Sequence, residues 1–128
     1  MKLLLDTHAL IWFISGDDKL GEQAKEAFLN QDNMLFFSKA SLWEITIKIS
    51  LGKLVLAEHW LTAIEKEMAS NGIQWLEIEI DHCKILAGLP FHHRDPFDRL
   101  IISQAISESM SIVSIDSQFS RYPLDIIW

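Results

Sequence analysis

The sequence opens with Lys2-Leu3-Leu4-Leu5-Asp6, a short apolar run that ends on an acid. A run of this length, stopped by a polar residue, is typical of a buried strand. The same pattern returns later in the chain, where Ser111 to Ile115 lead directly into Asp116. Strands that read as continuous apolar runs favour a parallel sheet that is covered on both faces. The two stretches therefore predict an α/β fold with an acid at the end of each strand.

The residues between these two strands alternate between further apolar runs and helical patterns. Strands are also expected at residues 34–37, 73–80 and 126–128, and helices at 7–15, 22–30, 58–70, 81–89 and 96–110. A further helix, capped by Ser38 or Ser41, is expected to run to about residue 51. Asp95 as N-cap and Pro96 at the first helical position make the helix at 96–110 the best defined. This alternation predicts a sheet with helices on both faces.

Length and charge restrict the possible functions. The chain has 128 residues, which suits one domain spanning residues 1–128. Its 11 basic and 18 acidic residues give a formal net charge of −7, whereas proteins that bind nucleic acid by neutralising phosphates are usually basic. The single cysteine, Cys83, excludes a disulfide within one chain and is expected to be a small core residue. No targeting segment or membrane span is recognisable, so we expect a cytoplasmic protein.

Four acids are expected to meet at one edge of the sheet. Asp6 and Asp116 end strands, and open α/β sheets place their sites at the carboxyl ends of strands. Glu44 lies in the first turns of its helix, and Asp98 is the third residue of the helix that begins at Pro96. Helix N-termini commonly lie at the same edge, so the four side chains could converge.

Four carboxylates in one pocket repel one another. At about 4 Å and an effective dielectric constant of about 20, each pair costs about 4 kcal/mol. A hard divalent cation would relieve this repulsion, and ligands that are all oxygen favour magnesium or manganese over zinc. Such an ion inverts the sign of the site, brings phosphate to an acidic surface and activates water for hydrolysis.

Each acid taken alone also has a structural interpretation as a helix cap, a first-turn acid or half of an i,i+4 ion pair. Asp6, Asp95 and Asp116 could simply cap helices or turns. Asp98 could be a first-turn acid, and Glu44 could pair with Lys48. The alternative function is therefore a non-catalytic α/β module that binds protein. Phosphoryl transfer at an aspartate is disfavoured, because a phosphatase of the haloacid-dehalogenase type would need an acid where His8 stands.

Four motifs, in order, resemble those of the PIN-domain family and, within it, the VapC-type toxins of bacterial toxin–antitoxin pairs. They are Leu3-Leu4-Leu5-Asp6-Thr7-His8-Ala9-Leu10, Ser41-Leu42-Trp43-Glu44-Ile45 followed by Lys48 and Gly52-Lys53-Leu54, His92-His93-Arg94-Asp95-Pro96-Phe97-Asp98-Arg99-Leu100-Ile101, and Ser114-Ile115-Asp116 with Phe119 and Tyr122. The resemblance spans nearly the whole chain. It implies a three-layer α/β/α sandwich with a central parallel sheet of about five strands, and an endoribonuclease that depends on magnesium or manganese.

Carried over by position, the resemblance makes Asp6, Glu44, Asp98 and Asp116 the metal-binding and catalytic acids. Asp6 and Asp98 would hold the metal directly, with Asp116 direct or through water, and Glu44 would orient or deprotonate the attacking water. Ser114 matches a hydroxyl that supports the metal site, and Asp95 is a possible additional outer acid. Relatives usually dimerise and are inhibited by a small antitoxin, so the expected partners are a cognate antitoxin, a second copy of the chain and an RNA substrate.

Two basic and two imidazole side chains near the third motif have open interpretations. Arg94 and Arg99 would contact phosphate or a partner's acids, or else pair with the acids of the motif itself. His92 and His93 lack a second ligand pair at zinc spacing, so we expect a loop or supporting role for them. His8 follows the first acid and is expected to lie near the pocket.

Aromatic residues are the remaining unusual feature. The chain has 5 tryptophans, and core packing accounts for some of them. Trp12 lies on the first expected helix and Trp43 near the start of the helix that carries Glu44, and both are candidates for a dimer face or an antitoxin groove.

Overall fold

The computed structural model describes every residue from Met1 to Trp128 and contains one five-stranded parallel sheet. The strands are β1 (Lys2–Leu5), β2 (Met34–Ser38), β3 (Ile73–Leu76), β4 (Ser111–Val113) and β5 (Ile126–Ile127). The helices are α1 (Thr7–Ser15), α2 (Glu22–Leu29), α3 (Lys39–Ser50), α4 (Trp60–Ser70), α5 (Ile80–Ala87) and α6 (Pro96–Glu108), with a short 3-10 helix, η1 (Ser117–Arg121), after β4.

The sheet is ordered β3-β2-β1-β4-β5, so β1 is central. The chain adds β2 and β3 on one side of β1 and then crosses to place β4 on the other. Open α/β sheets bind ligands at such a reversal, outside the carboxyl ends of the strands. Leu5 pairs with Val113 in the register of β1 and β4, so Asp6 and Ser114 emerge side by side.

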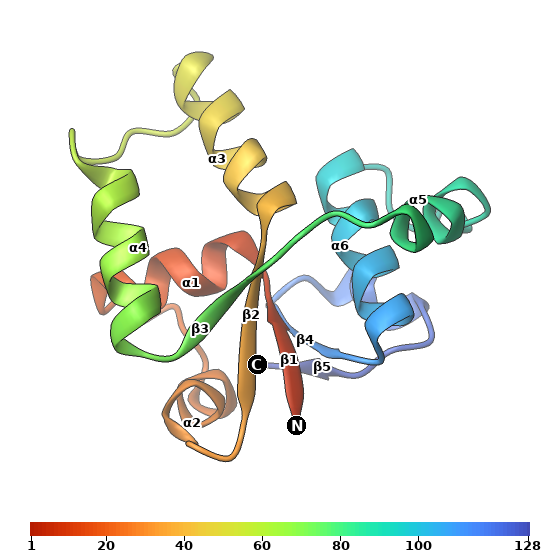
Figure 1. Cartoon of the computed structure of the whole chain (residues 1–128), viewed down its shortest axis with the longest axis horizontal. Helices are drawn as coiled ribbons and strands as arrows, with labels where there is room; N and C mark the ends of the chain where they lie inside the picture. Colours follow the sequence, from red (N-terminus) through yellow and green to blue (C-terminus); the bar gives the residue numbers. More distant parts are fainter.

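Successive residues of β1 face opposite helical layers. Leu3 and Leu5 pack in one apolar cluster, with residues from α1, α2 and α4. Leu4 packs in a second cluster, with residues from α6 and η1. Figure 1 shows α1, α2 and α4 on one side of the sheet and α5 and α6 on the other. The side-chain period of two residues in a strand therefore supplies both layers, and the predicted three-layer α/β/α sandwich is confirmed.

Three strands are shorter than the sequence predicts, and β5 is shorter by one residue, since it ends at Ile127. β3 ends at Leu76 rather than at residue 80, because its only partner residue there is Ser38, after which β2 turns into α3. β4 ends at Val113 rather than at Ile115. At that point the Ser114 hydroxyl bonds to Asp6 and to the backbone N–H of Asp116, which bends the chain away from the sheet.

The helices also differ at their ends. Ser38, not Ser41, caps α3, and its hydroxyl accepts the N–H of Ala40 at 3.0 Å. α4 begins at Trp60 rather than at residue 58, because a turn closes from the Trp60 N–H to the Ala57 carbonyl. α6 ends at Glu108, since Ser109 adopts the left-handed conformation with φ 55°. None of the helices is both long and apolar enough to cross a membrane.

Candidate metal centre

Asp6 is held at the carboxyl end of β1 by groups from three directions. Its own N–H donates to the Val113 carbonyl of β4 at 3.0 Å. Its Oδ1 accepts the N–H of Thr7 at 2.7 Å, which makes it the N-cap of α1. Its Oδ2 accepts the hydroxyl of Ser114 at 2.8 Å. The carboxylate is therefore buried but satisfied by neighbouring donors.

Asp116 follows β4 and lies beside Asp6 across the reversal point. Its Oδ1 accepts the N–H of Gln118 at 2.9 Å and so caps η1. Its own N–H donates to the Ser114 hydroxyl at 3.0 Å. Ser114 is fully buried and thus joins the two strand-end acids, donating to one and accepting from the other. The predicted supporting position of Ser114 is consistent with this link.

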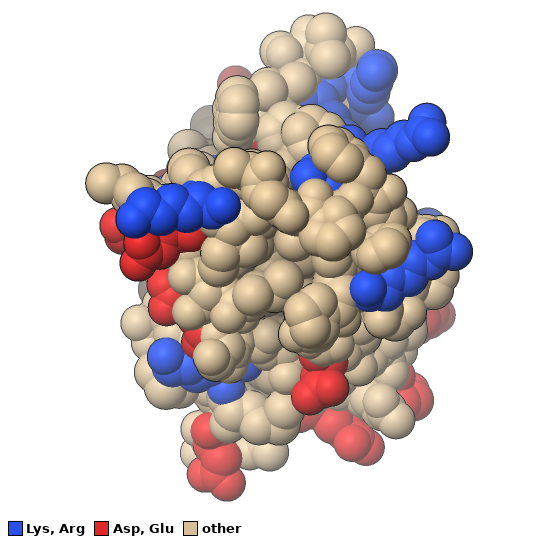
Figure 2. Space-filling view, turned by 90° about the vertical axis from the view of Figure 1, so that its right-hand side faces the viewer, with Lys and Arg blue, Asp and Glu red and all other residues tan.

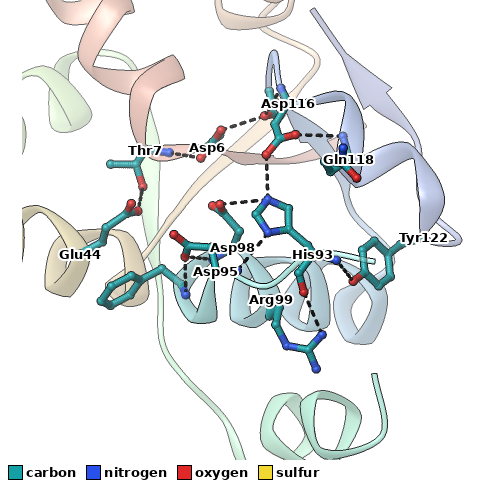
Figure 3. Close-up of polar contacts among 12 residues, drawn as sticks. Asp6, Thr7, Glu44, His93, Asp95, Asp98, Arg99, Asp116, Gln118 and Tyr122 are labelled. Carbon is teal, nitrogen blue, oxygen red and sulfur yellow. Dashed lines mark hydrogen bonds and ion pairs between the residues drawn. The ribbon is translucent and has the colours of Figure 1, made fainter. Parts of the chain in front are cut away.

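Asp98 comes from the first turn of α6 and faces the same edge of the sheet (Figure 3). Its Oδ2 lies 3.3 Å from Nε2 of His93. The neighbouring Asp95 is the N-cap of α6, where its Oδ1 accepts the N–H groups of Phe97 and Asp98 at 2.8 and 3.1 Å. One oxygen of Asp95 therefore serves the helix, while its charge still contributes to the cluster.

Glu44 approaches from α3 and is buried. Its Oε1 accepts the Thr7 hydroxyl at 2.7 Å. Its Oε2 forms an ion pair with Lys48 at 2.6 Å, one turn further along the helix. Burial opposes the charge of Lys48, but the hydrogen bond to Glu44 and the nearby acids raise the pKa of Lys48 above its ordinary value. Glu44 is thus fixed between Thr7 and Lys48 beside the cluster.

The acids share one electrostatic field. Burial raises the pKa of Asp98 to about 8, with further contributions from the charges of Asp6, Asp95, Glu44 and Asp116. Burial also raises the pKa of Asp6, although its hydrogen bonds to Ser114 and Thr7 oppose the shift. The fold therefore brings together the acids that the sequence places at two strand ends and near two helix starts. These acids repel one another, so a positive charge among them would be stabilising.

The donor set fits a hard divalent cation. Ligand atoms of His93, Asp98 and Asp116 lie within 4.8 Å of one another. The acids supply carboxylate oxygens, which are the ligands that magnesium and manganese prefer. A carboxyl group with a pKa of about 8 keeps a proton at neutral pH, and a cation could replace that proton. Asp6, Asp98 and Asp116 are the residues that could hold it, with Glu44 beside them.

Comparison with known protein families identifies the fold. The family model described as the PIN domain matches residues 3–124. The chain belongs to the PIN domain family. No curated protein sequence matches the chain.

Solved structures agree with this assignment. VapBC2 from Rickettsia felis, bound to a DNA fragment from its promoter, has a TM-score of 0.75 and 19% identity, covering 98% of this chain and 97% of that one. DNA-bound VapBC from Salmonella typhimurium has a TM-score of 0.69 and 25% identity, with 98% and 96% covered. VapBC-1 from nontypeable Haemophilus influenzae has a TM-score of 0.71 and 21% identity, also with 98% and 96% covered. The whole chain therefore has the fold of these proteins.

Arg99 has neither of the predicted roles in this PIN domain. It is buried, and its guanidinium donates to the carbonyls of Leu89, Pro90 and His93 at 3.0 to 3.2 Å. The guanidinium carbon also lies 3.8 Å from the centre of the Phe91 ring. Arg99 thus ties the loop before α6 to the helix, because a side chain in the first turn can reach back to carbonyls that precede it.

His93 lies in the loop before α6, which agrees with the expected loop or supporting role, and its ring reaches the acids. Its Nε2 lies 2.8 Å from Asp116 Oδ2, between two of the acids. The available signal was its position two residues before the N-cap Asp95, from which a ring can fold back over the first turn of α6. His92 next to it is exposed.

Two further predictions have outcomes, and the interface role of Trp43 stays a prediction. Cys83 is exposed rather than in the core, because His82 occupies the inward position of α5 and bonds to Glu108 at 3.0 Å. His8 is exposed, but its charge lowers the pKa of Asp6, so it does lie near the pocket as expected. Trp43 is 56% exposed and packs edge-on against Phe97.

Proposed function

We propose that this PIN domain is an endoribonuclease dependent on magnesium or manganese, and the toxin of a VapBC-type toxin–antitoxin pair. The observation that carries the proposal is the acidic cluster at the reversal point of the sheet, where burial and four neighbouring acids raise the pKa of Asp98 to about 8. Structural caps alone do not need four acids from separate elements to face one another. A divalent cation would neutralise the clustered acids and allow the site to bind phosphate.

Asp6 and Asp98 are the residues proposed to hold the cation directly, with Asp116 direct or through water. A bound magnesium or manganese ion supplies Lewis acidity, which polarises a phosphodiester and lowers the pKa of water. The chain's own contribution is to fix the carboxylates. The Ser114 hydroxyl and the Thr7 N–H orient Asp6, and the N-terminus of η1 orients Asp116.

Glu44 is proposed to orient or deprotonate the attacking water. Its two oxygens contact the Thr7 hydroxyl and the Lys48 ammonium, which fix the orientation of the carboxylate. Each oxygen retains a further acceptor site for a water proton. Hydrolysis by that water leaves a 3′-hydroxyl and a 5′-phosphate on the products.

The distribution of charge supports a polyanionic substrate despite the net charge of −7. Figure 2 shows one face of the molecule, on which Lys and Arg side chains lie mostly in the upper part and Asp and Glu mostly in the lower part. The upper part is the end at which the strands finish in Figure 1. Positive side chains towards that end of this face would help to attract phosphates.

The proposed partners are an antitoxin and a second copy of the chain. The proposed location is the cytoplasm. The support is that the solved structures compared above are VapBC proteins, two of them bound to DNA. The chain also offers an apolar hollow of about 240 Å³ between α1 and α4, lined mainly by Ile11, Ile14, Leu56, Trp60 and Ile64. Co-expression with the product of a small adjacent reading frame tests the pairing, since a cognate antitoxin should co-purify and block cleavage.

The nuclease activity is tested with purified protein and end-labelled RNA. We expect cleavage with magnesium or manganese, none after chelation by EDTA, and products that end in a 5′-phosphate. Asp98→Asn should be inactive, whereas Asp18→Asn, an exposed acid outside the cluster, should cleave normally. Failure of the wild-type protein to cleave any RNA in the presence of either metal would support the non-catalytic binding module instead.

A further inference from the structure

His93 is in the loop that precedes α6, and its ring lies between the side chains of Asp98 and Asp116 (Figure 3). Its Nε2 is 2.8 Å from Oδ2 of Asp116 and 3.3 Å from Oδ2 of Asp98. Its Nδ1 accepts the backbone N–H of Asp95 at 3.2 Å. One ring nitrogen therefore faces a donor, and the other faces two acceptors.

The hydrogen bond to Nδ1 determines where the ring carries its proton. A neutral imidazole has one N–H, and the nitrogen that accepts a hydrogen bond carries no proton. Because Nδ1 accepts from Asp95, the proton is on Nε2, which donates to Asp116 and Asp98. A nitrogen that bears a proton has no free lone pair for a metal, so Nε2 is a donor to the carboxylates and not a ligand.

The loop and η1 hold the ring in this position. The N–H of His93 donates to Oη of Tyr122 at 2.8 Å, and that hydroxyl donates to the Pro90 carbonyl at 2.7 Å. The His93 carbonyl accepts from the guanidinium of Arg99 at 3.2 Å. The ring itself packs at a tilt against Phe119, with 5.5 Å between the ring centres. A donor fixed this well can orient the carboxylates that it contacts.

We propose that His93 is a positioning residue of the metal centre. Its Nε2–H links Asp98 on α6 to Asp116 after β4 and holds the two carboxylates at a spacing that accepts one divalent cation. The inference rests on the proposed function. The competing role is that of a third ligand, because the ligand atoms of these three residues lie within 4.8 Å of one another.

The first test determines the tautomer of His93 by NMR. In metal-free protein labelled with ¹⁵N-histidine, the ring nitrogen shifts distinguish Nε2–H from Nδ1–H, and loss of signals in His93→Gln assigns them. We expect the Nε2–H tautomer, unchanged when magnesium is added. A proton on Nδ1 in the metal-free protein, or loss of the Nε2 proton on adding magnesium, would overturn the proposal. The tautomer is determined in wild-type protein, and the variant serves only to assign the signals.

The second test measures magnesium and manganese affinity by isothermal titration calorimetry. His93→Gln keeps an N–H donor at the place of Nε2, and His93→Leu removes it. Gln should bind within about threefold of wild type, whereas Leu should weaken binding about 10- to 100-fold. Equal losses in both variants would mean that His93 is a ligand, and unchanged affinity in Leu would mean that its role is only structural. Either result overturns the proposal.

His92→Leu is the matched control, since His92 is the exposed neighbour and contacts the Tyr122 ring from outside the cluster. Its affinity should equal that of wild type. Wild-type protein that binds neither metal would refute the proposed metal centre and, with it, the role of His93. Wild-type binding that persists unchanged in His93→Leu would refute only the role of His93 and leave the nuclease proposal standing.

Discussion

The candidate site has two unlike halves. The strand half consists of Asp6, Ser114 and Asp116, at or just after the ends of β1 and β4. The helix half consists of Glu44 on α3, His93 in the loop before α6 and Asp98 on α6. In the strand half, Asp6 accepts hydrogen bonds from Thr7 and Ser114, which oppose the effect of burial on its pKa. In the helix half, burial and four other acids raise the pKa of Asp98 to about 8.

This difference shows what each half contributes. Backbone N–H groups at a strand end and a helix start satisfy a carboxylate where it stands. Asp98, on α6, adds negative charge that these backbone N–H groups do not neutralise. A proton or a cation must therefore neutralise it. The strand half therefore provides a rigid base, and the helix half provides the excess charge that makes the site bind metal.

The largest effect is expected when one acid is removed from either half of the site. Asp6→Asn and Asp98→Asn should each reduce RNA cleavage by about 1,000-fold or more, equivalent to about 4 kcal/mol of transition-state stabilisation. Each substitution removes a charged ligand while keeping the shape of the side chain. Cleavage rates on a labelled RNA measure the loss, with circular dichroism to check the fold. Near-wild-type rates in either variant would remove that residue from the site.

The effect of magnesium on stability should distinguish the acid of the helix half from acids elsewhere. At a magnesium concentration 100-fold above the dissociation constant, the wild-type protein should gain about 2.7 kcal/mol in free energy of unfolding. The gain should vanish in Asp98→Asn and persist in Asp18→Asn. Thermal melts with and without magnesium measure it. A full gain in Asp98→Asn would mean that any bound ion does not depend on the helix half.

Without metal, the helix half should make stability depend on pH. The folded pKa of Asp98, about 8, lies above its ordinary value of 3.8, so the folded state holds a proton that the unfolded state releases. Its stabilising contribution is complete below about pH 4 and is lost as pH rises to about 8. Relative to wild type, Asp98→Asn should therefore gain about 1–3 kcal/mol between pH 5 and pH 8.5. Urea unfolding in EDTA measures this difference, and an equal difference at both pH values would contradict it.

The strand half was the more predictable of the two from sequence. The apolar run of β1 locates its end and hence Asp6. The apolar run before Asp116 identifies that acid, although β4 itself ends two residues earlier than the run, at Val113. That these two strands are neighbours is a long-range pairing, which no local pattern encodes. The sequence could therefore state the convergence of the acids only as a consequence of strand order.

The helix half depends on loop conformation, which the sequence specifies poorly. The third motif identifies Asp98 and the cap at Asp95, but not that the loop before them folds His93 towards Asp116. The same loop buries Arg99, which a pattern of charges alone would place in solvent or in an ion pair. Inward and outward positions of the short helix α5 differ by one residue, which explains why Cys83 was wrongly placed in the core.

The smallest expected effect tests the link inside the strand half. Ser114→Ala removes the hydroxyl that donates to Asp6 at 2.8 Å and accepts from the N–H of Asp116 at 3.0 Å. The free energy of unfolding should fall by about 1–2 kcal/mol, because a buried carboxylate loses a donor. Ser103→Ala is the matched control, since that buried hydroxyl donates only to the Arg99 carbonyl within α6, and it should change stability by less than about 0.5 kcal/mol.

Ser114→Ala should also make stability depend on pH through Asp6 in the strand half, as it does through Asp98 in the helix half. With one donor fewer, Asp6 loses a hydrogen bond that lowers its pKa, while burial continues to raise it. The pKa of Asp6 should then rise further, and the loss of stability should grow between pH 5 and pH 8.5, as for Asp98 in the wild-type protein. Urea unfolding of Ser114→Ala at both pH values, in EDTA, measures the change. A loss that is the same at both values would mean that Ser114 supports the backbone of Asp116 and not the charge of Asp6.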